Sequence, residues 1–148
     1  MQTEHLERLT RSCLQAPVSK KLNREIEIPE AGKCRVTLPF QEELTQNSGL
    51  LHGAIIFEAA DTAGFIAANS VEETYSVLTL EFNINFIRPV SSGKITAEAA
   101  VVHHGKTVII CTSKVINDKG KLVAEARGTY LVSNILLANV PGYMQDEA

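Results

Sequence analysis

The chain has 148 residues, of which 45% are hydrophobic and 21% charged, and its formal net charge is −3 at pH 7. This length fits one domain, and the composition is ordinary for a soluble globular protein. The negative charge argues against a nucleic-acid partner, as does the lack of a Lys/Arg run or of aromatic residues interleaved with basic ones.

Signals for export or membrane insertion are not predicted. The first 20 residues are too polar for a signal peptide. Glu58 and Asp61 interrupt the longest apolar stretch, residues 54–68, so it is not expected to span a membrane. Three cysteines lie far apart without the spacing of metal ligands, and they are interpreted as buried, reduced thiols of a cytoplasmic protein: Cys13, Cys34 and Cys111.

The N-terminal part of the chain predicts a short helix followed by a hairpin. Residues Glu4–Gln15 carry apolar side chains at helical spacing, and this helix should end before Pro17. Two alternating runs follow, Leu22–Ile28 and Cys34–Leu38. The turn residues 29–32 between them favour an antiparallel hairpin.

A long, unusually apolar helix is predicted over residues 52–70, HGAIIFEAADTAGFIAANS, after a loop-like segment over 40–51. Apolar residues occur on every side of its helical wheel, which is typical of a helix that is buried on all sides. Its many alanines would let neighbouring backbone approach closely.

The pattern changes to a period of two in four runs that predict strands: Tyr75–Phe86, Lys94–Val102, Thr107–Ile116 and Leu122–Val132. Short turn-rich segments separate these runs and favour antiparallel neighbours. The tail, residues 133–148, mixes apolar residues with Pro, Gly and acidic ones and is expected to be loosely held.

Together these elements predict an α+β fold in a single domain over residues 1–148, with one long central helix wrapped by an antiparallel sheet of about six strands. The N-terminal helix would cover about residues 4–15 and the core about 20–132. A single curved sheet covers only part of such a helix, so a second copy of the chain is expected to bury the remainder.

Asp61 is the first candidate for chemistry, because it lies midway along the most apolar helix. Burying a carboxylate costs several kcal/mol unless the group is paired or hydrogen-bonded. The nearest cation in the sequence is His52, about two and a half turns away. Asp61 could face a wet subunit interface or bind a distant arginine, but a carboxylate of raised basicity, able to activate water or attack a carbonyl, is favoured. Glu58, one turn away on a neighbouring face, is expected to be a solvated or rim charge.

The start of the same helix is the second candidate site. The first turn of a helix leaves backbone N–H groups unpaired and carries about half a positive charge. Gly53 has no side chain to keep a ligand from its amide, which suits the oxyanion formed when a thioester carbonyl is attacked. A His–Gly pair at a helix start is often only a cap, and the functional interpretation depends on Asp61, nine residues after the His.

The stretch over residues 46–65, QNSGLLHGAIIFEAADTAGF, resembles the signature of the PaaI-like acyl-CoA thioesterases of the hotdog fold (4-hydroxybenzoyl-CoA thioesterase superfamily). Their pattern is Asn or Gln, then Gly, then His-Gly-Gly, then Asp or Glu nine residues after the His. The resemblance continues through residues 79–89, Gly93, 104–107 and 120–130. It covers about residues 33–132 and implies a hotdog-fold thioesterase.

The resemblance implies a role for each matching residue. Asp61 would be the general base or the nucleophile, and the Gly53 amide would polarise the thioester carbonyl. Gln46 would position substrate or water, and Thr79 would help to hold the attacking water. His52 would order the loop, and a direct catalytic role is the less favoured alternative for it. In such enzymes the site lies between two subunits, with Gln46 and Gly53 of one facing Asp61 and Thr79 of the other.

Residues that could contact coenzyme A lie in two further places. The turn formed by Gly105, Lys106 and Thr107 is a candidate for the pantetheine or the phosphates, and Arg88 is a second candidate for phosphate. A lysine in a turn is more often simply solvated, and this alternative stays open for both places.

The sequence departs from the family pattern at two points. Ala54 replaces the second Gly of His-Gly-Gly, and its methyl group could narrow the acyl slot. Gln46 is followed by Asn47, and the sequence leaves open which of the two amides points into the site.

The expected activity is hydrolysis of an acyl-CoA to a free acid and coenzyme A, without a metal or an organic cofactor. His103 and His104 are adjacent and point to opposite sides of a strand or turn, so they cannot together bind a metal ion. The family resemblance suggests a homotetramer built as a dimer of dimers. Two alternatives are a non-catalytic acyl-CoA-binding module and a hotdog hydratase or dehydratase, which would pair a histidine with an acid.

Overall fold

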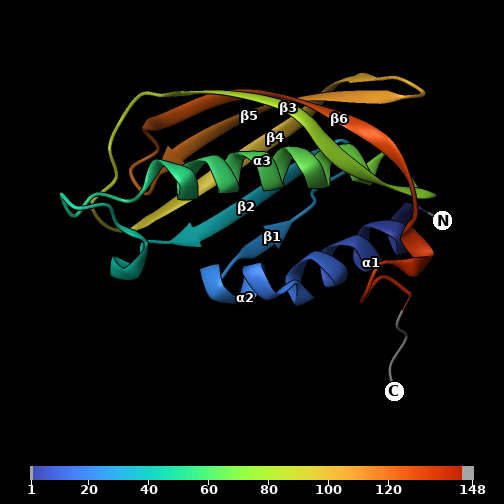
Figure 1. The fold of residues 1–148 in the computed structure, drawn as a ribbon, viewed down its shortest axis with the longest axis horizontal. Coiled ribbons are helices and arrows are strands. Elements are labelled where there is room, and N and C mark those ends of the chain that lie inside the picture. The colour runs from blue at the N-terminus through green and yellow to red at the C-terminus, as the bar shows by residue number, and fades with distance from the viewer. Residues whose placement is uncertain (1, 145–148) are drawn as a thin grey trace.

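Helix α3, Gly53–Ser70, lies at the centre of this computed structural model, which describes residues 2–144. An antiparallel sheet of six strands, in the order β1-β2-β4-β5-β6-β3, curves around the helix (Figure 1). This arrangement confirms the predicted α+β class and is the hotdog fold that the resemblance implied.

The strands are β1 Glu25–Glu27, β2 Lys33–Pro39, β3 Tyr75–Phe86, β4 Lys94–His104, β5 Val108–Asn117 and β6 Leu122–Leu136. The other helices are α1 Gln2–Gln15, α2 Pro17–Leu22, and two short 3-10 turns, Glu42–Leu44 and Leu137–Asn139. Strand β3 has the predicted bounds, and strands β4 and β5 agree with prediction to within two residues. Strand β6 is longer than predicted at its C-terminal end.

Helix α2 was not predicted, because Pro17 was interpreted only as the end of the preceding helix. Pro17 instead begins α2, where its missing N–H costs nothing because the first N–H groups of a helix have no partner within it. Asn23 ends α2 in the left-handed conformation, with φ 52°. The predicted strand Leu22–Ile28 is therefore shortened to β1, which still forms the expected hairpin with β2.

The core lies between α3 and the concave face of the sheet. Burial alternates residue by residue along β2 and β5, as it should in strands that have one covered face. Five alanines of α3 are fully buried, and their small side chains let the sheet approach the helix closely: Ala59, Ala60, Ala63, Ala67 and Ala68. The larger side chains that fill this core include Val36, Leu38, Val77, Ile95, Ile109, Val115 and Val123.

Burial of α3 on all sides holds only for its C-terminal part within one chain. Every residue from Ile66 to Ser70 is buried. Towards the N-terminus, Phe57, Asp61 and Phe65 are half-buried and Ala54 is exposed. The helical wheel therefore predicted more burial of α3 than one chain provides.

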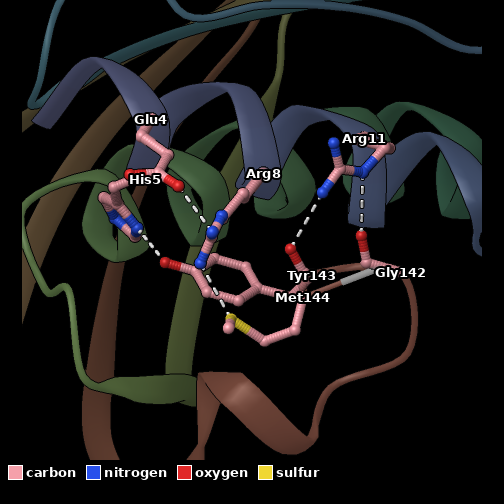
Figure 2. Close-up of polar contacts among 7 residues, drawn as sticks. All are labelled: Glu4, His5, Arg8, Arg11, Gly142, Tyr143 and Met144. Carbon is pink, nitrogen blue, oxygen red and sulfur yellow. Dashed lines mark hydrogen bonds and ion pairs between the residues drawn. The ribbon is translucent and has the colours of Figure 1, made fainter. Parts of the chain in front are cut away.

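The end of the described chain is packed, contrary to the prediction of a loosely held tail. Tyr143 is buried against α1, and its hydroxyl lies 2.6 Å from Nδ1 of His5 (Figure 2). Nε2 of His5 lies 2.8 Å from the Asn69 carbonyl oxygen, so this nitrogen donates, and Nδ1 of the neutral ring accepts from the tyrosine. Arg11 donates to the carbonyl oxygens of Gly142 and Tyr143. The last part of the predicted tail, residues 145–148, lies outside the described residues.

We expect the Tyr143→Ala variant to lose about 3 kcal/mol of unfolding free energy, because it removes a buried ring and leaves Nδ1 of His5 without its donor. Urea unfolding of the purified protein measures this change. Met144→Ala, at a neighbouring side chain that is 46% exposed, is the matched control and should change stability by less than about 0.5 kcal/mol. Equal losses in both variants would contradict the anchoring role of Tyr143.

Two of the three thiols are buried as predicted, and Cys13 is half-buried. Burial raises the pKa of Cys13 to about 11 and that of Cys111 to about 12, and it also raises the pKa of Cys34. All three side chains are therefore protonated thiols near neutral pH. Among residues 2–144, no helix is long and apolar enough to cross a membrane.

Strand β3 forms one edge of the sheet and pairs with β6 on its other side. Leu78 and Leu80 are 46% and 57% exposed on this strand of 12 residues. A long edge strand with exposed apolar side chains is a template for pairing with another chain.

Candidate active site

Asp61 lies on the side of α3 that faces β3 and β6, where two hydroxyl groups contact it. Its Oδ1 accepts a hydrogen bond of 2.9 Å from Oγ1 of Thr79 and one of 3.1 Å from the hydroxyl of Tyr130. No arginine or lysine forms an ion pair with Asp61 within residues 2–144. The alternative in which a distant arginine neutralises this carboxylate is therefore wrong for the single chain.

Burial raises the pKa of the Asp61 carboxyl, and the hydrogen bonds from Thr79 and Tyr130 only partly offset this rise. The net direction is upward, as expected for a carboxylate of raised basicity. Such a group ionises at higher pH than an exposed aspartate and is a better proton acceptor once it is ionised.

Glu58 is not the solvated charge that the sequence suggested. Its carboxylate forms an ion pair with Arg24, which follows α2 and is buried, and accepts a hydrogen bond of 2.9 Å from Oγ1 of Thr62. Arg24 also donates to Oγ of Ser19, at 2.8 Å. Of the two carboxylates on α3, Glu58 is thus neutralised, whereas Asp61 is held by hydroxyl groups alone.

Replacing Arg24 by Leu should lower the free energy of unfolding by about 2–3 kcal/mol, because Glu58 would lose its cation. Breaking a fully buried pair costs about 3–5 kcal/mol, and a smaller loss is expected here because the Glu58 side chain is 25% exposed. The double variant Arg24→Leu/Glu58→Leu should recover most of this loss in urea unfolding. An equally unstable double variant would show that the loss comes from packing of the Arg24 stem.

The start of α3 is organised by His52. Nδ1 of this residue accepts a hydrogen bond of 2.9 Å from the Ala54 amide, so the ring caps the helix. The Gly53 amide makes no hydrogen bond to any residue within 2–144. It is therefore available to a ligand at the positive end of the helix.

A pocket of about 300 Å³ beside Gly53 brings together three predicted site residues, Gln46 and Gly53 from around the start of α3 and Arg88 from the segment after β3. Its lining residues are Gln46, Leu50, Leu51, Gly53, Ile56, Phe86, Ile87, Arg88 and Pro89. Gln46, Gly53 and Arg88 thus share one cavity, although the Arg88 guanidinium also donates to the Leu122 carbonyl oxygen at 2.6 Å.

Of the two neighbouring amide side chains, that of Gln46 lines the pocket and that of Asn47 does not. The Oε1 atom of Gln46 accepts a hydrogen bond of 2.9 Å from Oγ of Ser48. Its Nε2 group makes no hydrogen bond to the described part of the chain, so the side chain can offer an N–H donor to a carbonyl oxygen.

Asp61 and Gly53 cannot act on the same atom within one chain. They lie eight residues apart on one helix, which separates them by about 12 Å along its axis. The candidate residues therefore form two candidate half-sites: the pocket at the start of α3, and the carboxylate with its two hydroxyl donors in the middle of α3.

The candidate coenzyme A contacts lie in two different places. Arg88 belongs to the pocket. The turn of Gly105, Lys106 and Thr107 does not line this pocket, and the Thr107 carbonyl oxygen accepts from the Val132 amide, two residues beyond Tyr130 on β6. Lys106 and Thr107 are exposed at this turn.

Tyr130 was missed by the sequence analysis, which assigned no role to it. A tyrosine at an inward-facing strand position must find a partner for its hydroxyl, and this is the signal that could have identified it. Nothing in the sequence shows which partner that is, because Asp61 lies 69 positions away.

The sequence model of the Thioesterase superfamily matches residues 48–124, a segment that contains His52, Gly53, Asp61 and Thr79. Among the relatives, a 1,4-dihydroxy-2-naphthoyl-CoA hydrolase of Listeria monocytogenes is 35% identical over 109 residues, which is 73% of this chain and 89% of the relative.

Solved structures give the same result. The PaaI protein from the phenylacetic acid degradation operon of E. coli superposes with a TM-score of 0.84 at 25% identity, over 92% of this chain and 98% of that one. A thioesterase of Haemophilus influenzae superposes with a TM-score of 0.77 at 26% identity, over 93% and 92% of the two chains. The family resemblance based on residues 33–132 is thereby confirmed.

Proposed function

We propose that this chain, which belongs to the thioesterase superfamily and is therefore a thioester hydrolase, hydrolyses acyl-CoA thioesters to a free acid and coenzyme A. The observation that carries the proposal is Asp61, a partly buried carboxylate with raised pKa whose contacts within residues 2–144 are hydroxyl groups rather than a cation. The Listeria relative is a coenzyme A thioester hydrolase by name, which supports the same class of substrate.

The complete site would lie between two copies of the chain, with the Gly53 pocket of one facing Asp61 of the other. This proposal is supported by the distance of about 12 Å between the two residues along α3. It is also supported by the exposed Leu78 and Leu80 on the edge strand β3, which a second copy could cover. By family resemblance, two such dimers would assemble into a tetramer in the cytoplasm.

The proposed reaction begins when the thioester carbonyl oxygen accepts a hydrogen bond from the Gly53 amide at the positive end of α3. Asp61 then either removes a proton from a water that attacks the carbonyl carbon, or attacks that carbon itself. The C–S bond breaks and coenzyme A leaves as a thiolate. In the second route the product is a mixed anhydride, which water opens to free acid and Asp61. Gln46 would orient the carbonyl, and Thr79 would hold Asp61 and its water.

Recognition of coenzyme A is assigned to the two candidate cations. Lys106, exposed in the turn between β4 and β5, and Arg88, which lines the pocket, could each reach a phosphate. Ala54 is exposed next to the pocket entrance residue Gly53, so its methyl group could limit the acyl slot. No metal or organic cofactor is required for these steps.

A thiol-release assay over acyl-CoA substrates of different chain length and aromaticity tests the proposal. Release of coenzyme A that depends on Asp61 is expected for at least one substrate. Binding of acyl-CoA without release would indicate the non-catalytic module. Loss of the enoyl absorbance of crotonyl-CoA would indicate the hydratase alternative, which has little support because hydroxyl groups rather than a histidine contact Asp61 in the described chain.

A further inference from the structure

Tyr130 occupies a slot between α3 and the sheet that two glycines create. The residue is fully buried on β6. A Cβ atom added at Gly64, on α3, would overlap the Tyr130 hydroxyl. A Cβ atom at Gly128, on β6, would lie 2.8 Å from the hydroxyl oxygen and 2.9 Å from a ring carbon. The absence of side chains at these positions lets the phenol reach α3 from β6.

The hydroxyl of Tyr130 ends beside Asp61. It lies 3.1 Å from Oδ1 of the carboxylate and 3.2 Å from the backbone carbonyl oxygen of the same residue. Thr79 donates to that same Oδ1 from β3, at 2.9 Å. The other carboxylate oxygen, Oδ2, makes no hydrogen bond within residues 2–144. Both anchoring hydroxyls therefore act on one oxygen and leave the other free.

Tyr130 keeps its proton in this position. Burial raises the pKa of its hydroxyl above the ordinary range, and the negative charge of Asp61 and the nearby Cys111 raise it further. The side chain is thus a neutral O–H donor at any pH at which the enzyme would work, and it stabilises the ionised form of Asp61.

We propose that Tyr130 is a positioning residue, which together with Thr79 fixes Oδ1 of Asp61 so that Oδ2 is the oxygen presented to the water or the thioester carbon. The inference rests on the proposed function. In an anchored carboxylate, a lone pair of the free oxygen always points at the reacting atoms. A carboxylate that rotates about its Cβ–Cγ bond has that orientation only part of the time.

Within residues 2–144, no other ionisable group shifts the pKa of Asp61 through its charge. On α3, Glu58 is engaged by Arg24. On β5, Cys111 lies opposite Gly128 and acts on Tyr130. The pKa of Asp61 itself responds to burial first, then to Thr79 and to Tyr130.

The test is Tyr130→Phe, which removes the hydroxyl and keeps the ring. The rising limb of kcat/KM against pH should move to higher pH by about half to one unit, because the ionised form of Asp61 loses a donor. The plateau value of kcat should fall about tenfold, with KM little changed.

Thr79→Val should move the rising limb of kcat/KM in the same direction. Tyr143→Phe is the matched control, since it removes a buried hydroxyl that contacts His5 instead, and its limb should stay in place.

A second measurement does not depend on turnover. Carbon-13 NMR titration of the Asp61 carboxyl should show a higher pKa in Tyr130→Phe than in the wild-type protein. If wild-type protein releases no thiol from any acyl-CoA but this difference is present, the proposed function fails and the anchoring holds. If Asp61 titrates at the same pH in Tyr130→Phe and in the wild-type protein, or if the two active enzymes have the same pH profile, the role of Tyr130 is overturned. The proposed function is unaffected by that result.

Should Tyr130→Phe fail to fold, the test uses protein in which fluorotyrosine replaces tyrosine. The labelling is done in the Tyr143→Phe protein, so that the hydroxyl that contacts His5 is not fluorinated as well. Fluorination makes the Tyr130 hydroxyl a stronger donor without removing it, so the pKa of Asp61 should fall. An unchanged Asp61 titration would overturn the proposal.

Discussion

Asp61→Asn should lower kcat for acyl-CoA hydrolysis by about two to four orders of magnitude, because the amide can neither accept a proton from water nor attack the carbonyl. The amide oxygen can still accept the hydrogen bonds that Thr79 and Tyr130 donate, so the local structure should be kept. Thiol release from the best acyl-CoA substrate measures the effect.

Glu58→Gln is the matched control for this experiment, since it neutralises the neighbouring carboxylate on the same helix. It should keep most of the activity and lose stability, because Arg24 would be left without its anion. Wild-type turnover in Asp61→Asn, or equal loss of turnover in both variants, would show that Asp61 is not the reacting group.

The same Asp61→Asn variant should be at least as stable as the wild-type protein at pH 8. Burial raises the pKa of Asp61 in the folded state above its unfolded value, so the ionised carboxylate opposes folding wherever both states are ionised. This cost is complete above the folded pKa and disappears as the pH falls below the unfolded pKa. Thermal unfolding at pH 8 and pH 4 should therefore show an advantage for the variant that is larger at pH 8. The opposite order would mean that the carboxylate stabilises the fold.

Local patterns predicted the elements whose periodicity reflects burial. Strand β3 has the expected bounds, Tyr75–Phe86, because apolar-polar alternation is a strand pattern, although Val77 is the only residue of this strand that one chain buries. Helix α3 begins and ends close to the predicted residues because its alanine-rich stretch is flanked by a capping residue, His52, and by turn residues. Asp61 was identified from local sequence as well, because a charge in an apolar helix conflicts with its surroundings and needs an explanation.

Contacts between distant segments were beyond this reasoning. No spacing rule links Arg24 with Glu58, so the ion pair that distinguishes the two carboxylates of α3 could not be predicted. The slot for Tyr130 depends on Gly64 and Gly128, which come from different elements and show their effect only when the sheet closes over the helix. The packed tail was missed because Tyr143 finds its partner, His5, at the opposite end of the chain.

Gly53→Pro should lower kcat about 10²- to 10³-fold, the usual effect of removing one donor to an oxyanion. Proline has no N–H, but it suits the first position of a helix, and the extended conformation of His52, with ψ 136°, is the one preferred before proline. The Gly53 amide makes no hydrogen bond within residues 2–144, so the fold should lose no hydrogen bond.

Gly53→Ala is the control variant. It adds a Cβ atom 3.5 Å from the Phe86 ring but keeps the amide, and its kcat should remain within a few-fold of the wild-type value. Similar losses in both variants would point to crowding of the pocket.

Mixing the two inactive proteins, Asp61→Asn and Gly53→Pro, shows whether the half-sites belong to different copies. In a mixed dimer, one site would combine the intact Gly53 amide of the first protein with the intact Asp61 of the second, and the other site would carry both changes. Random reassembly of equal amounts after reversible unfolding makes half of the dimers mixed, so about a quarter of wild-type activity should return. If each chain held a complete site, every site would carry one of the two changes and the mixture would stay inactive. The recovered activity therefore measures directly whether the roughly 12 Å between Gly53 and Asp61 along one helix is bridged by a second chain.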